Sequence, residues 1–223
     1  MRSIIVNCGP YATPSATNIR TASSVGGAGA VTLNGSLVSG GVATLDQPRR
    51  VLFTSAGNDS GITFTVTGTD WNNQSASEVV TGANASTVYT IYDFKTVTSI
   101  VASGASAGNV SIGTNGIASS RPVNLDLYAD SSIYVQTDTG GSAAITYSIQ
   151  LTGDNPNDPS NPVPYTSVRW INSGTAALVN ATSAQNANQA GIPTMMRVYI
   201  SNAGSNTSAS VHVNFNQAGM VSY

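Results

Sequence analysis

The chain has 223 residues, enough for one large β domain or two small ones with a sizeable core. Only 8% of the residues are charged and the net charge is −2, so Ser, Thr, Asn and Gln must form most of the polar surface. The basic residues form no stripe, which argues against a nucleic-acid partner, and no stretch approaches about eighteen apolar residues, so no membrane span is expected. Copies with so few charges repel each other weakly, which favours a subunit packed beside identical neighbours; a Ser/Thr-rich extracellular domain is the alternative.

The N-terminal segment carries neither a disulfide partner nor an evident secretion signal. Cys8 is the one cysteine, so no internal disulfide can form, which suits a reducing or redox-indifferent site of assembly. The apolar run of residues 4–6 is much shorter than the core of a signal peptide. We therefore expect no secretion by the general route.

Alternation of apolar and polar residues with a period of two predicts strands in the first half of the chain. In residues 62–67 the apolar side chains would lie on one face and three threonines on the other. Residues 70–73, Asp-Trp-Asn-Asn, predict a hairpin connection to a return strand at 78–80. The same test predicts strands at residues 30–33, 50–55, 88–94, 97–101 and 109–113.

The second half shows the same pattern, with two interruptions. Predicted strands are residues 123–128, 132–137, 143–151, 166–171, 195–200 and 210–215, while 180–190 has room for a short helical turn. Small residues and a proline at 116–122 break the rhythm. We predict an all-β, antiparallel β-sandwich or jelly-roll-like fold of two units, residues 1–118 and 119–223. A proline-rich loop at 153–164 lies in the second unit and is predicted to be a contact arm.

The sequence offers little for catalysis or metal binding. His212 is the one histidine and is predicted to face outward on a strand, so a histidine-rich metal site is excluded. GASAG at 104–108 matches a nucleophile elbow, but strand-like residues on both sides favour a loop between strands. Asp154 and Asp158 suit either a calcium site or ordinary turns. We expect no enzyme activity and no cofactor.

A sugar-binding platform is a further possibility that the residues leave open. The aromatic residues that could form it, about half of which should be core by parity, are Trp71, Tyr89, Tyr92, Tyr128 and Tyr134.

Residues 43–114 contain an ordered series of short pieces. They are TSAGNDS at 54–60, FTVTGTD at 64–70, Ser77-Glu78 before two valines, FKTVTSI at 94–100 and VSIGT at 110–114. This series resembles a widespread family of tailed-bacteriophage virion proteins, and the rest of the chain is more loosely similar to the β-rich second half of the same family. Trp71-Asn72-Asn73 departs from the family pattern, which commonly has a Gly-containing turn after GTD.

The resemblance implies a structural component of a virion, assembled in the host cytoplasm. One place is a capsid cement or decoration protein bound across neighbouring subunits of the major capsid protein, with copies of itself in a trimer or other symmetric oligomer. The other is a tail, collar or fibre-anchor component, with binding of a host glycan as a further option.

The candidate contact residues lie at turns and in the proline-rich loop. Arg49 and Arg50 are chosen because a guanidinium can bind a carboxylate of a neighbour with two hydrogen bonds; a solvated strand start is the alternative for this pair. The full set is Trp71, Asn72, Asn73, Arg49, Arg50, Asn155, Pro156, Asp158 and Pro159.

Overall fold

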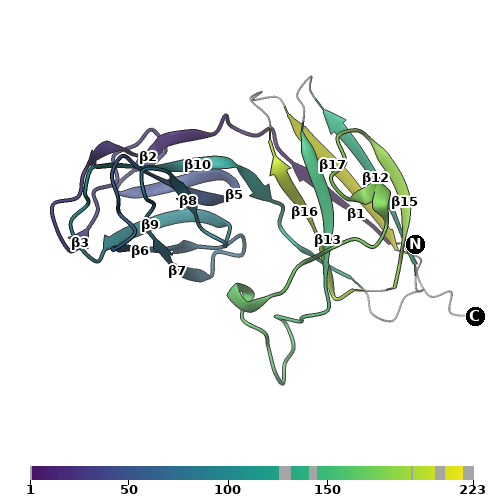
Figure 1. The fold of residues 1–223 in the computed structure, drawn as a ribbon. Coiled ribbons are helices and arrows are strands. Elements are labelled where there is room, and N and C mark those ends of the chain that lie inside the picture. Colours follow the sequence, from purple (N-terminus) through teal and green to yellow (C-terminus); the bar gives the residue numbers. More distant parts are fainter. Residues whose placement is uncertain (1, 126–131, 141–144, 192, 204–208, 218–223) are drawn as a thin grey trace, which may run out of the picture. The chain divides into compact units, whose positions relative to one another are not determined.

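The computed structural model describes residues 2–125, 132–140, 145–191, 193–203 and 209–217 (Figure 1). Within these residues the chain forms β1 to β17 and two single-turn 3₁₀ helices, and the paired strands run antiparallel. The prediction of an all-β antiparallel sandwich protein is confirmed. In the described part of the chain, no helix is of a length and hydropathy that would let it cross a membrane.

The chain divides into two compact units. One consists of residues 14–117, all of them described. The other combines residues 1–13 with residues 118–223. The predicted boundary near residue 118 agrees with this division, but the assignment of residues 1–13 to the first unit is wrong. The reason is that β1 (Arg2–Cys8) pairs along its whole length with β17 (Ser210–Gln217).

Residues 14–117 form a two-layer sandwich joined through one long strand. The first part of β5 pairs with β9, and its last part pairs with β8. One layer has the order β5-β9-β6-β7, and β10 neighbours β5 and β2 in the other. The strands are β2 (Ser15–Ser24), β3 (Gly29–Ala30), β4 (Val38–Ser39), β5 (Val42–Ser55), β6 (Thr63–Thr69), β7 (Ser75–Thr81), β8 (Thr87–Tyr89), β9 (Phe94–Ala102) and β10 (Asn109–Ser119).

The core of this unit follows from the alternation seen in the sequence. Phe64 and Val66 of β6 are fully buried, while Thr63, Thr65 and Thr67 lie on the opposite face. The Phe64 ring stacks on Phe53 of β5, with centroids 5.0 Å apart. Position 68 also faces inward. It is a glycine because a Cβ there would lie 1.9 Å from the carbonyl oxygen of Thr96.

The second unit also packs two sheets face to face. One has the order β1-β17-β12-β15; the other contains β14-β13-β16, with β11 paired to β16. Alternate residues of both meet in one core that includes Val135, Val213, Phe215, Tyr147 and Ile149. The remaining elements are β11 (Val123–Asn124), β12 (Ser132–Gly140), β13 (Thr146–Thr152), η1 (Tyr165–Ser167), β14 (Ile171–Asn172), η2 (Ala176–Leu178), β15 (Gln185–Ala190) and β16 (Met195–Asn202).

Four predicted segments differ from the structure. Of residues 30–33 only Ala30 lies in a strand, at the end of β3. Residues 166–171 contain the end of η1 and only the first residue of β14, because the chain is still leaving the proline-rich loop. Residues 88–94 are interrupted at 90–93, between β8 and β9. The helical turn proposed within 180–190 is wrong, since Gln185–Ala190 is strand β15 paired with β12. Of the predicted strands at 123–128 and 143–151, residues 126–128 and 143–144 lie outside the described residues.

Replacing Phe64 by Ala should lower the free energy of unfolding by about 3–5 kcal/mol, because it removes a buried ring and its stacking contact with Phe53. Thr65→Ala is the matched control, one residue away on the outer face, and should cost less than about 1 kcal/mol. Urea unfolding followed by circular dichroism measures both. Equal losses would contradict the burial pattern of β6.

Candidate functional site

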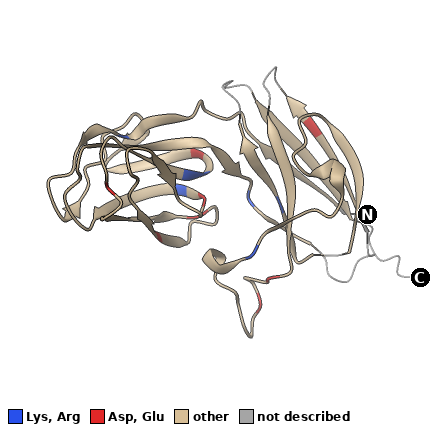
Figure 2. Cartoon of the chain, in the orientation of Figure 1, with Lys and Arg blue, Asp and Glu red and all other residues tan. Residues whose placement is uncertain are grey.

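Charged residues are sparse along the chain (Figure 2). Most of those that the structure describes contact groups of the same chain. The strongest case is Arg49, whose side chain is only 1% exposed. Its Nε and Nη2 donate to Oδ1 and Oδ2 of Asp46 at 2.6 and 2.7 Å, and its Nη1 donates to the carbonyl of Asn115 at 3.2 Å. The sequence explains the bend that brings the pair together: β5 has a register shift between Thr44 and Arg49, around Pro48, which has no N–H to donate.

This arrangement corrects the prediction for the Arg49-Arg50 pair. Arg49 is buried and donates two hydrogen bonds to Asp46. It is therefore neither an outward contact residue nor a solvated strand start. Arg50 is 18% exposed, lies 3.8 Å from Asp93 and stacks over Tyr89 at 5.5 Å. The two arginines therefore contact groups of their own unit, where the sequence predicts an outward-facing pair.

Three further basic side chains also bind groups of the same chain. Arg20 donates to the carbonyl oxygens of Val110, Ser23 and Ser24, and burial lowers the pKa of its guanidinium. Lys95 donates to two carbonyls of β5. Arg197 donates to Gln150 at 2.9 Å and stacks over Trp170 at 4.5 Å.

Carboxylates hold loop backbone in place. Glu78 accepts hydrogen bonds from the N–H groups of Ile91 and Tyr92 at 2.7 and 2.9 Å, which fixes the turn between β8 and β9. Asp59 accepts from the N–H of Ala107 at 2.7 Å. Each of these charges therefore serves an internal contact and does not project from an outer sheet face.

The predicted hairpin tip is present between β6 and β7. Asp70 Oδ1 accepts from the N–H groups of Asn72 and Gln74 at 2.8 and 2.9 Å, and Asn73 adopts a left-handed backbone with φ 60°. Asn72 and Asn73 are exposed, while Trp71 is half-buried. The tip is thus a fixed turn, and it presents two amide side chains that could contact a partner.

The proline-rich loop is closed by its own turns. The carbonyl of Asn155 accepts from the N–H of Val163, and Asp158 Oδ1 accepts from the N–H groups of Ser160 and Asn161. Asn155, Pro156 and Asp158 are half-buried, and Pro159 is exposed. Hydrogen bonds from these backbone groups lower the pKa of Asp158.

The two aspartates of this loop are held by different partners. Asp154 binds the backbone and guanidinium of Arg169, with Oδ2 and Oδ1 at 2.7 and 3.1 Å, and the side-chain hydrogen bond from Arg169 is the main cause of its lowered pKa. Asp158 faces backbone N–H groups instead. Among the described residues no group of three or more His, Cys, Asp or Glu side chains is placed to hold a metal ion. The turn interpretation therefore accounts for the contacts of Asp158, whereas Asp154 is held by an ion pair with Arg169.

The two residues examined for catalysis lie in ordinary structural settings. Ser106 of GASAG accepts from the N–H of Val25 and donates to the carbonyl of Gly108, in a loop between strands β9 and β10, as predicted. His212 is exposed on β17, also as predicted, and its Nδ1 donates to Asn7 Oδ1 at 2.8 Å. Burial raises the pKa of the Cys8 thiol to about 12, so this thiol is neutral near pH 7.

The structure brings together an uncharged surface on the layer β7-β6-β9, here called the hydroxyl face. Cross-strand register places its side chains in rows across the three strands. The rows are Thr81–Thr63, Val79–Thr65–Val101, Ser77–Thr67–Ser99 and Ser75–Thr69–Thr96. No charged residue belongs to these rows, so the face is lined with hydroxyl and methyl groups.

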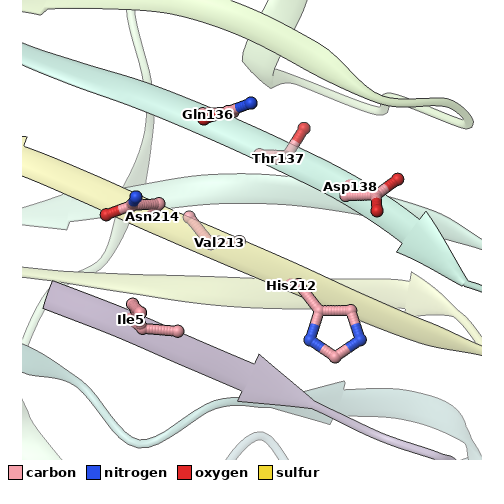
Figure 3. A pocket seen from close by; sticks show the side chains of 7 residues that line it. All are labelled: Ile5, Gln136, Thr137, Asp138, His212, Val213 and Asn214. Carbon is pink, nitrogen blue, oxygen red and sulfur yellow. The ribbon is translucent and has the colours of Figure 1, made fainter.

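A second surface, here called the amide face, covers the outer side of β1-β17-β12-β15. Its rows are Ser3–Asn216–Tyr134–Asn188, Ile5–Asn214–Gln136–Asn186 and Asn7–His212–Asp138. Figure 3 shows part of it, a hollow of about 190 Å³ lined by side chains of β1, β12 and β17. The sequence reasoning missed this face because β1 was not predicted, although Ser3, Ile5 and Asn7 already alternate with Ile4 and Val6.

Two of the aromatic residues considered for a sugar-binding platform are well exposed. Tyr89 and Tyr134 are 46% and 41% exposed and belong to different units. Tyr92 and Trp71 are half-buried, and Tyr128 lies outside the described residues.

Comparisons with known proteins leave the family of this chain open. No protein-family model and no curated protein matches it. A crystal structure of a protein from Parabacteroides distasonis ATCC 8503, described as a candidate secreted protein, aligns with 96% of this chain and 99% of its own at 9% identity and a TM-score of 0.24. A TM-score that low indicates neither the fold nor the function of this chain.

Asp46→Asn should lower the free energy of unfolding by about 3–5 kcal/mol, because the guanidinium of Arg49 would stay buried without its charge partner. Asp154→Asn is the matched control: its partner Arg169 is 86% exposed, so water replaces the lost contact and stability should change little. Denaturant unfolding of both variants measures the difference. A larger loss for Asp154→Asn would contradict this account of the two ion pairs.

Proposed function

We propose that this protein is a structural component of a bacteriophage virion, a cement or decoration protein that binds across neighbouring capsid subunits. The proposal rests on two broad polar sheet faces, the hydroxyl face without a charge and the amide face with a single aspartate. They are nearly neutral because most of the described charged groups bind partners within the chain. Such faces adhere through many modest contacts.

The resemblance to tailed-phage virion proteins supports the same role. Its pieces FTVTGTD and FKTVTSI, about thirty residues apart, are the neighbouring strands β6 and β9, and Ser77-Glu78 lies in β7 on the other side of β6. The resembling residues therefore build the layer that carries the hydroxyl face, so the shared pattern and the proposed contact surface coincide.

The physical mechanism is repetition of weak contacts. Removing a hydroxyl or amide from water costs far less than removing a charge, and a partner surface can restore its hydrogen bonds. Symmetry then repeats each contact around the shell, so avidity supplies the strength that one contact lacks. The hairpin tip Trp71–Asn73, at one end of the hydroxyl face, and the exposed Pro159 would add further contacts.

A second candidate is a tail, collar or fibre-anchor component that binds a host glycan. One observation favours it: exposed Tyr134 lies between Asn188 and Asn216 in its cross-strand row. An aromatic ring flanked by amides can stack on a sugar ring while the amides bind hydroxyl groups.

Copy number in purified phage particles tests the first proposal. Quantitative mass spectrometry should find the chain in hundreds of copies per particle, because a cement protein follows the symmetry of the shell. About a dozen copies would point instead to the tail or collar. Particles with none of the chain would overturn both virion roles.

Tyr134→Ala tests the glycan candidate. On a glycan array, binding by the wild type should be lost in Tyr134→Ala and kept in Tyr89→Ala, the matched control with a similarly exposed ring in the other unit. Loss of binding is expected because the ring supplies the stacking surface. No binding by the wild-type protein, or equal binding by both variants, would reject this candidate.

A further inference from the structure

Strand β7 is the last strand of its layer and its outer edge carries no paired strand. The order of the layer ends β9-β6-β7, and β7 pairs with β6 over all seven of its residues without a bulge. Every residue of this unit is described, and no other strand pairs with β7. Edge strands of soluble proteins are usually protected by Lys, Pro, a bulge or a covering segment. The sequence of β7, SASEVVT, contains none of the first three.

The hydrogen bonds next to the hairpin show which backbone groups of β7 face the edge. Gly82 N–H donates to the Ile62 carbonyl and Asp70 N–H donates to the Gln74 carbonyl, both at 2.9 Å. In an antiparallel ladder, hydrogen-bonded pairs recur at every second residue. The even-numbered residues of β7 therefore bond to β6, and the N–H and C=O groups of Ser77, Val79 and Thr81 point outward.

The neighbouring strand confirms this assignment. Ser103 N–H donates to the carbonyl of Thr63 at 2.9 Å, so the odd-numbered residues of β6 bond to β9. The even-numbered residues of β6 are then the ones that face β7, as the first argument requires.

The side chains along this edge suit a dry contact with another strand. Those of Ser75, Ser77, Val79 and Thr81 are exposed, and Val79 is 62% exposed. Glu78 is the one charged residue of β7, and its carboxylate accepts hydrogen bonds from Ile91 and Tyr92 within the same unit. No charge on the outer face of β7 would oppose an incoming strand.

We propose that β7 pairs antiparallel with β7 of a second copy of this chain, about a two-fold axis at Val79. The two layers would then form one continuous sheet, and their hydroxyl faces would form one surface. This inference concerns contact between copies and does not depend on the virion role.

Charge excludes one register of the second copy, and the exposed valine disfavours another. Since the outward groups belong to odd-numbered residues, hydrogen-bonded pairs across the axis must join odd with odd. An axis at Glu78 would set two carboxylates opposite each other, about 4.5 Å apart at Cα, which is unfavourable. An axis at Ser77 would leave each exposed Val79 opposite a serine.

An axis at Val79 avoids both faults. It sets Val79 opposite its own copy, Ser77 opposite Thr81, and Glu78 opposite Val80. Val101, Thr65 and Val79 form one row of the hydroxyl face, and this row would continue into the same row of the second copy. Because each subunit offers the same strand to the other, the contact closes as a dimer.

Val79→Lys tests the contact. Sedimentation equilibrium of the wild-type chain should give the molar mass of a dimer that dissociates on dilution. Val79→Lys should be a monomer at every concentration, because two ammonium groups would meet at the axis. Val101→Lys is the matched control: the residue lies on the same face, 43% exposed, two strands from the edge, and this variant should remain a dimer.

Thermal unfolding of both lysine variants verifies that they are folded. A wild-type chain that stays monomeric at high concentration, or that forms another oligomer unaffected by Val79→Lys, would overturn the proposal. Dissociation of both lysine variants alike would also overturn it, since a general effect of surface charge would then explain the result.

Spin labels test the register separately. Ser77→Cys and Thr81→Cys would be labelled one at a time; Cys8 is fully buried and its thiol pKa is about 12, so it should not react in the folded protein. With the axis at Val79, each label is two residues from it, and the two intermolecular distances should be equal, roughly 15 Å between Cα atoms. A clearly shorter distance for one label would place the axis elsewhere and reject the Val79 register.

Discussion

The structure depends on one constraint: a chain with few charges binds most of them internally. The bidentate contact between Arg49 and Asp46 is the clearest instance, since it holds a buried guanidinium where β5 passes from one layer of its sandwich to the other. Leaving either charge unpaired in that environment would cost several kcal/mol. The same residues that stabilise the interior are therefore missing from the surface, and the outer sheet faces are polar and nearly neutral.

Neutral faces of this kind have a specific physical character. A charged surface repels its own copies and binds water strongly, so contact requires matched opposite charges. The rows of Ser, Thr, Asn and Gln on these two units bind water less strongly and can exchange it for the hydroxyls and amides of a partner. The architecture thus favours broad contact with similar surfaces over binding of one small ligand, consistent with a hollow on the amide face formed by a few side chains and open to solvent.

The sequence predicted strands well where one face is buried and poorly elsewhere. In β6 and β17 the apolar residues alternate strictly, and both strands lie as predicted. β15, with the sequence QNANQA, has no such alternation because it is a polar edge strand, so its pairing with β12 rather than its composition makes it a strand. Residues 90–93 looked continuous with their neighbours, but Glu78 takes the N–H groups of Ile91 and Tyr92 and turns the chain. Long-range contacts of this sort leave no local signal.

The candidate surfaces show the same limit. The hairpin tip could be predicted because Asp70 and Asn73 act within five residues of each other. The amide face could not, because it forms only when β1 pairs with a strand about two hundred residues later. Arg49 was misjudged for a related reason: a charged residue in a strand is usually exposed, and only the bend at Pro48 turns it inward toward Asp46.

An uncharged face beside an open strand edge carries a risk of indiscriminate association, and Glu78 limits it. Its carboxylate lies on the inward side of β7, where it is bound by backbone N–H groups and leaves the outer face neutral. In any pairing that sets two copies of Glu78 opposite each other, however, the two charges would repel. One inward charge therefore permits strand addition while disfavouring a neighbouring register. Specificity in a sheet with so few charged residues then depends on where a single charge is placed, not on how many there are.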